Sequence, residues 1–185
     1  MFGHGRASRR ARQDPRVAIV VKRLLRPDAE ALFRLRRQAL IEEPFAFLSS
    51  PEDDLASSPD AVRDQLSSWS SFSAVFGAFS DEILVGMVGL TRDRPVKAAH
   101  RACIWGVFVK AEFRRQGVGK QLLEASLNYA RELDGVETVY LSVSEKTPEA
   151  KQLYESAGFE VWGFEPDCIR HAGESAREYH LSRAL

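Results

Sequence analysis

A strand-to-helix junction near the middle of the chain has the residue types of an anion-binding site. An apolar run that ends at Val107, Phe108 and Val109 leads into a basic turn with two glycines, and a helix is predicted over residues 117–133. Glycine lets the main chain approach an anion closely, and the N–H groups and dipole at a helix start favour negative charge. The junction therefore predicts a phosphate-binding site made of Arg114, Arg115, Gln116, Gly117, Val118, Gly119 and Lys120.

Two common phosphate-binding motifs do not fit this junction. A P-loop would need Ser or Thr after Gly119 and Lys120 and a glycine five residues before them, but Gln121 and Arg114 occupy those positions. A dinucleotide-binding fingerprint would need a third glycine where Leu122 stands. The sequence therefore excludes a P-loop NTPase and disfavours NAD binding.

The same turn resembles the pyrophosphate-binding pattern Gln/Arg-x-x-Gly-x-Gly/Ala of the GNAT-type N-acetyltransferases. Residues 114–119 read Arg-Arg-Gln-Gly-Val-Gly, and residues 153–159, Leu-Tyr-Glu-Ser-Ala-Gly-Phe, resemble the Leu-Tyr-x-x-x-Gly-Phe signature of that superfamily. The resemblance extends from about residue 17 to the end of the chain and is specific over residues 102–159. It implies an acetyl-CoA-dependent N-acetyltransferase, in which a primary amine of a small molecule or protein attacks the acetyl group directly.

The resemblance also implies roles for individual residues. Tyr154 would donate a proton to the departing thiolate, and a main-chain N–H of residues 107–109 would stabilise the developing oxyanion. Thr147 and Lys151 would join the CoA site, although relatives commonly carry Asn where Thr147 stands. No metal is implied. Tyr154 could instead pack against the sheet without a chemical role.

The general base is not identified by this resemblance. Histone-type relatives carry a glutamate on the central strand at the position of Cys103, and no carboxylate lies on this strand. The acceptor site is expected among the loops at residues 44–58 and 166–173 and the central strand, where Trp105 is predicted to share a face with Cys103 and Val107. Candidate bases on the loops are Glu42, Glu43, His100 and His171, each of which is more often an exposed or structural residue.

The order of the predicted strands and helices that position these residues indicates an α/β (α+β) fold. The sheet is predicted to be mixed, mostly antiparallel and of six to seven strands, with helices on both faces. The central pair, residues 102–109 and 138–144, is predicted to be parallel because a helix connects the two strands. Further strands are predicted at residues 17–25, 72–79, 83–91, 159–165 and 176–181. Helices are predicted from residues 27–28 to Pro44, over residues 59–66 and 117–133, and over residues 148–157, with Thr147 as N-cap and Gly158 after the end.

Composition narrows the class of protein. The 185 residues are 44% apolar and 28% charged, which fits a globular domain at residues 17–185. The apolar run at residues 17–21 is too short for a membrane span or a signal peptide. Cys103 and Cys168 lack metal-binding spacing, which favours a reducing, cytoplasmic location.

The 26 basic and 26 acidic residues are unevenly distributed. Five arginines and Asp14 give residues 1–16 a charge of +4, and the rest of the chain carries −4. This basic arm is expected to be a flexible terminus, so nucleic-acid binding is disfavoured. A catalytically silent module that binds CoA or a partner is the alternative function, and the sequence leaves a homodimer open.

Overall fold

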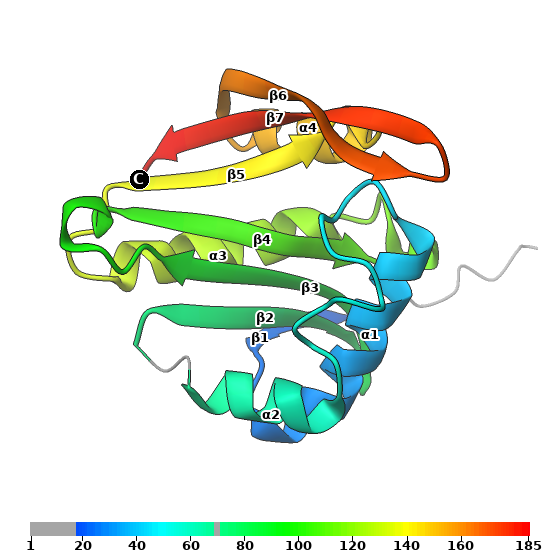
Figure 1. The fold of residues 1–185 in the computed structure, drawn as a ribbon. Helices are drawn as coiled ribbons and strands as arrows, with labels where there is room; N and C mark the ends of the chain where they lie inside the picture. The colour runs from blue at the N-terminus through cyan, green and yellow to red at the C-terminus, as the bar shows by residue number, and fades with distance from the viewer. Residues whose placement is uncertain (1–17, 69–70) are drawn as a thin grey trace, which may run out of the picture.

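A seven-stranded mixed sheet forms the centre of the computed structural model, which describes residues 18–68 and 71–185 (Figure 1). The strand order is β1-β2-β3-β4-β5-β7-β6, and every neighbouring pair is antiparallel except β4 and β5. The predicted fold class is therefore confirmed. The predicted basic arm and Val17, where the first strand is predicted to begin, lie outside the described residues. The strands are β1 (Ile19–Arg23), β2 (Ser73–Ser80), β3 (Ile83–Arg92), β4 (Arg101–Val109), β5 (Thr138–Ser144), β6 (Glu160–His171) and β7 (Glu174–Ala184).

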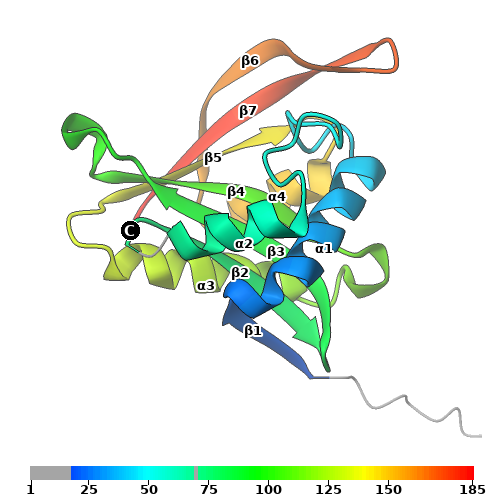
Figure 2. The same cartoon turned by 60° about the horizontal axis from the view of Figure 1, so that its bottom comes forward.

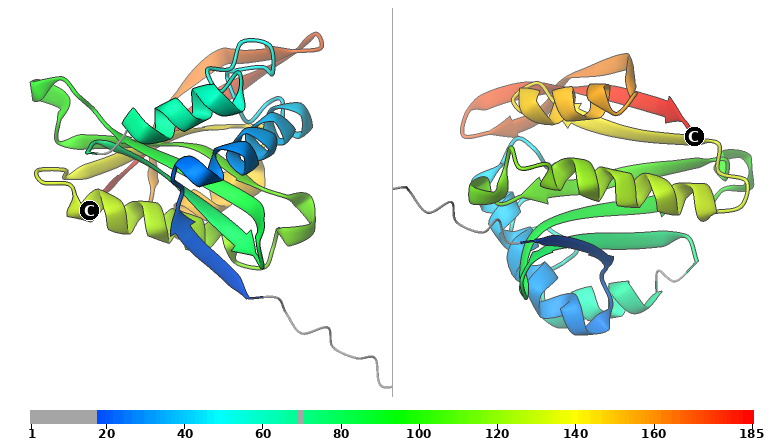
Figure 3. Two further views of the ribbon diagram at one scale, coloured as in Figure 1. Left: turned by 90° about the horizontal axis from the view of Figure 1, so that it is seen from below. Right: turned by 180° about the vertical axis from the view of Figure 1, so that it is seen from behind.

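Two pairs of helices cover the two faces of the sheet (Figure 3). Leu32, Leu35 and Met87 belong to the core under α1 and α2, whereas Leu122 and Leu141 belong to the core under α3 and α4. The helices are α1 (Ala29–Glu42), α2 (Pro59–Ser68), α3 (Val118–Glu132) and α4 (Pro148–Ser156), with short 3-10 turns η1 (Arg26–Asp28), η2 (Val96–Ala98) and η3 (Ala111–Phe113). None of the helices in the described part of the chain is long and apolar enough to span a bilayer.

The ends of the helices follow the predicted glycine and proline signals. Gly117 precedes α3 with a φ of +81°, and Gly158 follows α4 with a φ of +84°. Pro148 stands at the start of α4 as predicted. Thr147 occupies the N-cap position of α4 as predicted. Its side chain makes no cap hydrogen bond, however, and its Oγ1 donates to the carbonyl of Ser144 (3.0 Å).

The parallel strands β4 and β5 are paired over a short stretch only. Residues 101–103 pair with residues 138–140, and beyond this point the two strands separate. β4 stays paired with β3 on its other side as far as Val109. The main-chain groups of β4 that point away from β3 therefore face an opening in the sheet rather than another strand.

A β-bulge in β4 lies beside this opening. One residue of β3, Val88, faces two residues of β4, Gly106 and Val107. Gly106 has a φ of +64°, a conformation that glycine adopts without steric cost. The extra residue reverses the alternation of side chains, so Trp105 packs with the core under α1 and Val107 with the core under α3. The prediction that these two residues share a face is wrong for this reason.

Strands β6 and β7 form a long hairpin that reaches beyond the rest of the sheet (Figure 2). Residues 166–173, which the sequence predicts to be a loop, are mostly part of β6, and the turn is confined to Ala172 and Gly173. An irregularity between Glu165 and Ile169 accommodates Pro166, so the missing proline N–H does not end the strand. The predicted loop is therefore wrong, and the hairpin is longer than the sequence suggests.

Candidate active site

A small cavity lies where β4 and β5 separate. Its volume is about 70 Å³, and Tyr154 of α4 lies in its wall. The cavity therefore connects the predicted proton donor to the stretch of β4 that has lost its pairing with β5. Its other lining residues are Ala46, Ile104, Trp105, Gly106, Val107, Leu141, Ser142, Val143, Ser144, Thr147 and Ala150.

Tyr154 is almost fully buried, with 5% of its surface exposed. Its ring meets the ring of Phe159 edge-on, with 6.2 Å between centroids. Burial raises the pKa of Tyr154, so its hydroxyl stays protonated at neutral pH. Within the described part of the chain, no hydrogen bond of this hydroxyl is found, so the group can donate to a bound molecule.

The predicted phosphate-binding turn follows β4 and leads into α3. The first hydrogen bond of this helix joins the N–H of Gln121 to the carbonyl of Gly117 (3.0 Å). The N–H groups of Val118, Gly119 and Lys120 therefore precede the first helical hydrogen bond and are available to an anion. A Cβ atom on Gly117 would meet nothing within 4 Å, so space is open beside the turn.

Some side chains of this turn are held by contacts within the protein, and others extend into solvent. Arg114 forms an ion pair with Glu43, with 2.7 Å between Nη2 and Oε1. Arg115 has a φ of +57° and is exposed, as is Lys120. Gln116 donates a hydrogen bond to the main chain of η3. The structure thus leaves Arg115 and Lys120 in solvent at the turn and holds Arg114 against the end of α1.

The other predicted cofactor-binding residues lie on β4 and α4. Val107 lines the small cavity, whereas the Phe108 side chain is buried in the core under α1 and α2. The carbonyl of Val109 accepts a hydrogen bond from Arg114 (2.8 Å). Thr147 lines the cavity. Lys151 pairs with Glu155 on α4, and its ammonium group lies 5.3 Å from the centroid of the Tyr179 ring.

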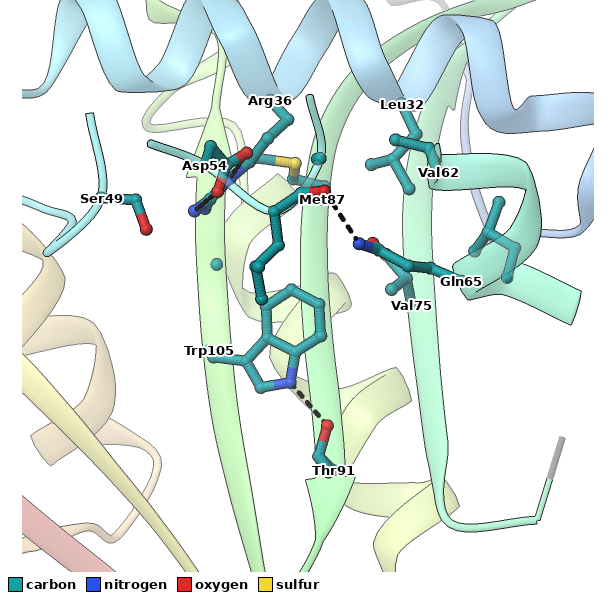
Figure 4. Close-up of a pocket in the computed structure, with 15 residues that line it drawn as sticks. Leu32, Arg36, Ser49, Asp54, Val62, Gln65, Val75, Met87, Thr91 and Trp105 are labelled. Carbon is teal, nitrogen blue, oxygen red and sulfur yellow. Dashed lines mark hydrogen bonds and ion pairs between the residues drawn. The ribbon is translucent and has the colours of Figure 1, made fainter. Parts of the chain in front are cut away.

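A second, larger cavity of about 370 Å³ lies between the sheet and helices α1 and α2 (Figure 4). Trp105 points into it from β4, and its indole N–H donates to Oγ1 of Thr91 (2.9 Å). Trp105 and Gly106 line both cavities, so the two meet at the bulge of β4. The remaining lining is mostly apolar: Leu32, Leu55, Ala56, Val62, Leu66, Val75, Met87 and Gly89, with Arg36, Ser49, Asp54 and Gln65 as polar members.

A partly buried ion pair forms the charged part of this wall. Arg36 of α1 binds Asp54 through two hydrogen bonds, Nε to Oδ2 (3.2 Å) and Nη2 to Oδ1 (3.0 Å). Its guanidinium also lies over the ring of Phe47, 4.7 Å from the centroid. A Cβ atom on Gly106 would lie 3.7 Å from Nη1 of Arg36. The pair therefore fixes the loop after α1 and places a cation next to the point where the cavities meet.

Comparison with known proteins decides the family. Residues 34–159 match the model of the Acetyltransferase (GNAT) family, and this match covers more than half of the chain. The chain belongs to the GNAT acetyltransferase family. Human N-acetyltransferase 8 is 37% identical over 98 residues, which cover 52% of this chain and 43% of that protein. The chain thus spans less than half the length of this curated GNAT relative.

Solved structures show the same GNAT fold. An acetyltransferase of the GNAT family from Streptococcus pneumoniae has a TM-score of 0.83 at 19% identity, covering 91% of this chain and 100% of that one. A putative acetyltransferase from Salmonella typhimurium, yncA, solved with its cofactor acetyl-CoA, has a TM-score of 0.80 at 15% identity, covering 91% and 94%. The family model confirms the predicted superfamily, and these structures confirm the fold.

None of the predicted candidate bases of this GNAT protein lines either cavity. Glu43 pairs with Arg114, and Glu42 accepts a hydrogen bond from Gln38 (2.8 Å). The His171 ring contacts the ring of Phe45, 5.9 Å between centroids, and His100 lies in the turn before β4. The structure does not bring these four residues to the place where the cavities meet.

Cys103, which is predicted to stand where histone-type relatives carry a glutamate, is a partly buried free cysteine of β4. Burial raises the pKa of its thiol to about 11. Burial and the neighbouring Glu178 likewise raise the pKa of Cys168 to about 11. Both thiols therefore stay protonated across the physiological range.

This predicts slow alkylation of the native GNAT protein. At pH 7.5 both cysteines should react with iodoacetamide about 100-fold more slowly than after unfolding, because two pKa units reduce the thiolate fraction by that factor. The rate should rise about tenfold per pH unit between pH 8 and 10. Mass spectrometry of each peptide measures it, with urea-unfolded protein as the control. Equal rates for native and unfolded protein at pH 7.5 would contradict the shift.

Gly89 of β3 makes room for the Trp105 indole. A Cβ atom at Gly89 would clash with three ring atoms of Trp105. We expect Gly89→Ala to displace the indole, break its bond to Thr91 and lower the free energy of unfolding by about 1–2 kcal/mol through overpacking. Urea titration measures this effect. Gly163→Ala on β6 is the matched control, because a Cβ there meets nothing within 4 Å. Equal effects of the two changes would count against this steric role.

Proposed function

We propose that this GNAT protein is an acetyl-CoA-dependent N-acetyltransferase that acts on a primary amine of a small molecule with an apolar body. The observation that carries the proposal is the meeting of the two cavities at Trp105 and Gly106. A donor bound between β4 and β5 and an acceptor bound under α1 and α2 would face each other across this bulge. Direct transfer between two bound molecules needs such a juxtaposition.

The residues present fit acetyl-CoA. The turn before α3 offers unpaired N–H groups, glycines and exposed basic side chains to a pyrophosphate, and the related fold of yncA is described with acetyl-CoA. We assign this contact to Arg115, Gln116, Gly117, Val118, Gly119 and Lys120, with Arg114 joining if it leaves Glu43. Thr147 and Lys151 would border the same molecule from α4. Bound acetyl-CoA supplies the acetyl group as a thioester that an amine can attack.

The chain's own groups would lower the barrier in two ways. Main-chain N–H groups of residues 107–109 would donate to the acetyl oxygen as negative charge develops, because β5 no longer pairs with β4 there. The hydroxyl of Tyr154 would donate its proton toward the leaving sulfur. Because burial raises the pKa of Tyr154, its hydroxyl is protonated before the transfer and can enter it as a donor rather than as a base.

The lining of the larger cavity favours a small, largely apolar acceptor. Its volume of about 370 Å³ lies in the lower part of the range for small-molecule sites. Leu32, Val62 and Met87 would contact an aliphatic or aromatic body, and the polar residues Ser49, Arg36, Asp54, Gln65 and Thr91 are spread around the pocket (Figure 4). We therefore expect arylalkylamines and apolar amino acids to be better acceptors than polyamines or protein lysines.

The test is a thiol-release assay with acetyl-CoA and a panel of amines: 2-phenylethylamine, tryptamine, leucine, spermidine and a lysine-containing peptide. Amine-dependent release, fastest with the first three, supports the proposal, and mass spectrometry of the product locates the acetyl group. Calorimetry with CoA is run alongside. Tight CoA binding without turnover on any amine would instead favour the alternative of a catalytically silent CoA-binding module, which the missing strand carboxylate motivates.

A further inference from the structure

The proposed transfer needs a group that removes a proton from the acceptor ammonium. An alkylamine is almost fully protonated at pH 7 and has no electron pair for attack in that form. Asp54 is the carboxylate among the described residues that line the cavities, and both of its oxygens accept hydrogen bonds from Arg36. The proton of the ammonium must therefore leave the cavity toward a group other than Asp54.

One such route starts at Ser142. Ser142 lines the cavity between β4 and β5, and its Oγ lies 2.9 Å from Nδ1 of His180. The two residues are direct partners in the β5–β7 pair, so the strand register fixes their spacing. On the far side of the imidazole, Nε2 lies 3.8 Å from Oε2 of Glu165 on β6. Three strands thus supply a chain of polar groups that starts at the cavity wall and runs along an exposed part of the sheet.

The polar groups of Ser142 and His180 lie on the same face of the sheet as the larger cavity, which is the proposed acceptor site. Leu141, Val143 and Leu181 belong to the core under α3 and α4. Because side chains alternate along a strand, Ser142 and His180 point to the opposite face. Trp105, which borders both cavities, packs on that face too. An amine that approaches the bulge from the larger cavity therefore meets the face that carries Ser142.

We propose that Ser142 and His180 form the proton relay for the acceptor amine, with Ser142 as the residue that touches the amine and His180 as a positioning residue that acts through it. The inference rests on the proposed acetyltransferase function. The ammonium N–H bond breaks as its proton passes to Oγ of Ser142, and the proton of the Ser142 hydroxyl passes to Nδ1 of His180. The amine keeps the electron pair for its attack. The imidazolium then releases the proton from Nε2 to solvent beside Glu165.

The surroundings of His180 suit this role. The ring stacks on Trp162 with 5.3 Å between centroids and an interplanar angle of 24°, which holds its plane. Two charged groups face the His180 ring: Glu165 on β6, and Glu178, which lies on β7 together with His180. Burial raises the pKa of Glu178, and Cys168 on β6 donates to this carboxylate (3.5 Å). Carboxyl groups therefore lie on two sides of the ring that receives the proton.

The test is the pH dependence of kcat/KM for the fastest amine of the panel. In the wild type, kcat/KM should rise with pH as the relay loses a bound proton, and then level off. His180→Gln should remove this rise and lower kcat at pH 7 at least tenfold, with KM for acetyl-CoA changed less than twofold. The NMR titration of the His180 imidazole in the substrate-free protein should have the same midpoint as the profile. His100→Gln is the matched control and should keep the wild-type profile.

Ser142→Ala provides a second test, because this exposed residue should tolerate the change even if His180→Gln fails to fold. We expect a loss similar to that of His180→Gln, and a double variant no slower than either single variant, since both changes interrupt one path. A wild type that transfers acetyl while both variants keep its rate and profile overturns the relay alone. A wild type without amine-dependent thiol release overturns the proposed function, and with it the relay.

Discussion

Replacing Tyr154 by phenylalanine should lower kcat about 100-fold and leave KM for acetyl-CoA within about twofold. The change removes one hydroxyl and keeps the ring that packs on Phe159. No hydrogen bond of this hydroxyl is found in the described part of the chain, so the fold should keep its stability within about 0.5 kcal/mol. Steady-state kinetics and thermal unfolding measure the two quantities. A lost proton donor should therefore appear in turnover and not in folding.

The control for this change is Tyr129→Phe. Tyr129 is a partly buried tyrosine of α3 whose ring contacts Phe76, 5.8 Å between centroids, and it lines neither cavity. Its variant should keep the wild-type kcat. If Tyr154→Phe also keeps the wild-type kcat, Tyr154 has a packing role only, and the leaving thiolate takes its proton from elsewhere.

Arg36→Ala should lower the free energy of unfolding by about 3 kcal/mol. The side chains of Arg36 and Asp54 are 15% and 9% exposed, so removing the guanidinium leaves a carboxylate without a partner in a poorly solvated place. The variant also loses the contact of the guanidinium with Phe47. We expect the melting temperature to fall by about 6–12 °C. The loop that carries Asp54 should loosen and weaken acceptor binding.

Arg34→Ala is the matched control, two residues away on α1. Arg34 pairs with Glu30 (2.8 Å), but its side chain is 76% exposed, so the change should cost within about 0.5 kcal/mol. Both variants make the same substitution in the same helix, so the helix propensity of alanine cancels between them. A similar melting temperature for the two variants would mean that the Arg36–Asp54 pair contributes little to stability.

The parts of this protein that the sequence predicts well depend on local signals. The start of α3 and both ends of α4 follow from Gly117, Pro148 and Gly158, whose conformational preferences act within a few residues. The parallel pairing of β4 and β5 follows from the helix between them. The glycine turn and the tyrosine of the candidate site lie inside these elements, and for that reason a short pattern was enough to find them.

The parts that the sequence misses depend on register and on distant contacts. Gly106 stands in a strand, which is a known sign of a bulge, but its effect on the direction of Trp105 requires the β3–β4 pairing. Arg36 and Asp54 are 18 residues apart, and Ser142 and His180 are 38 residues apart. Their meeting depends on how a loop folds over α1 and on which strand lies beside β5, and no local pattern contains that information.

Among the described residues, the two cavities share Trp105 and Gly106 alone, and this has a consequence for how the proposed acceptor preference could change. Val62, Gln65 and Leu66 come from α2, a helix that contributes nothing to the cavity next to Tyr154. Substitutions on α2 can therefore alter the size and polarity of the larger cavity while the cavity next to Tyr154 keeps its shape. If these cavities hold acceptor and donor as proposed, a library confined to α2 should yield altered amine preferences at unchanged affinity for acetyl-CoA.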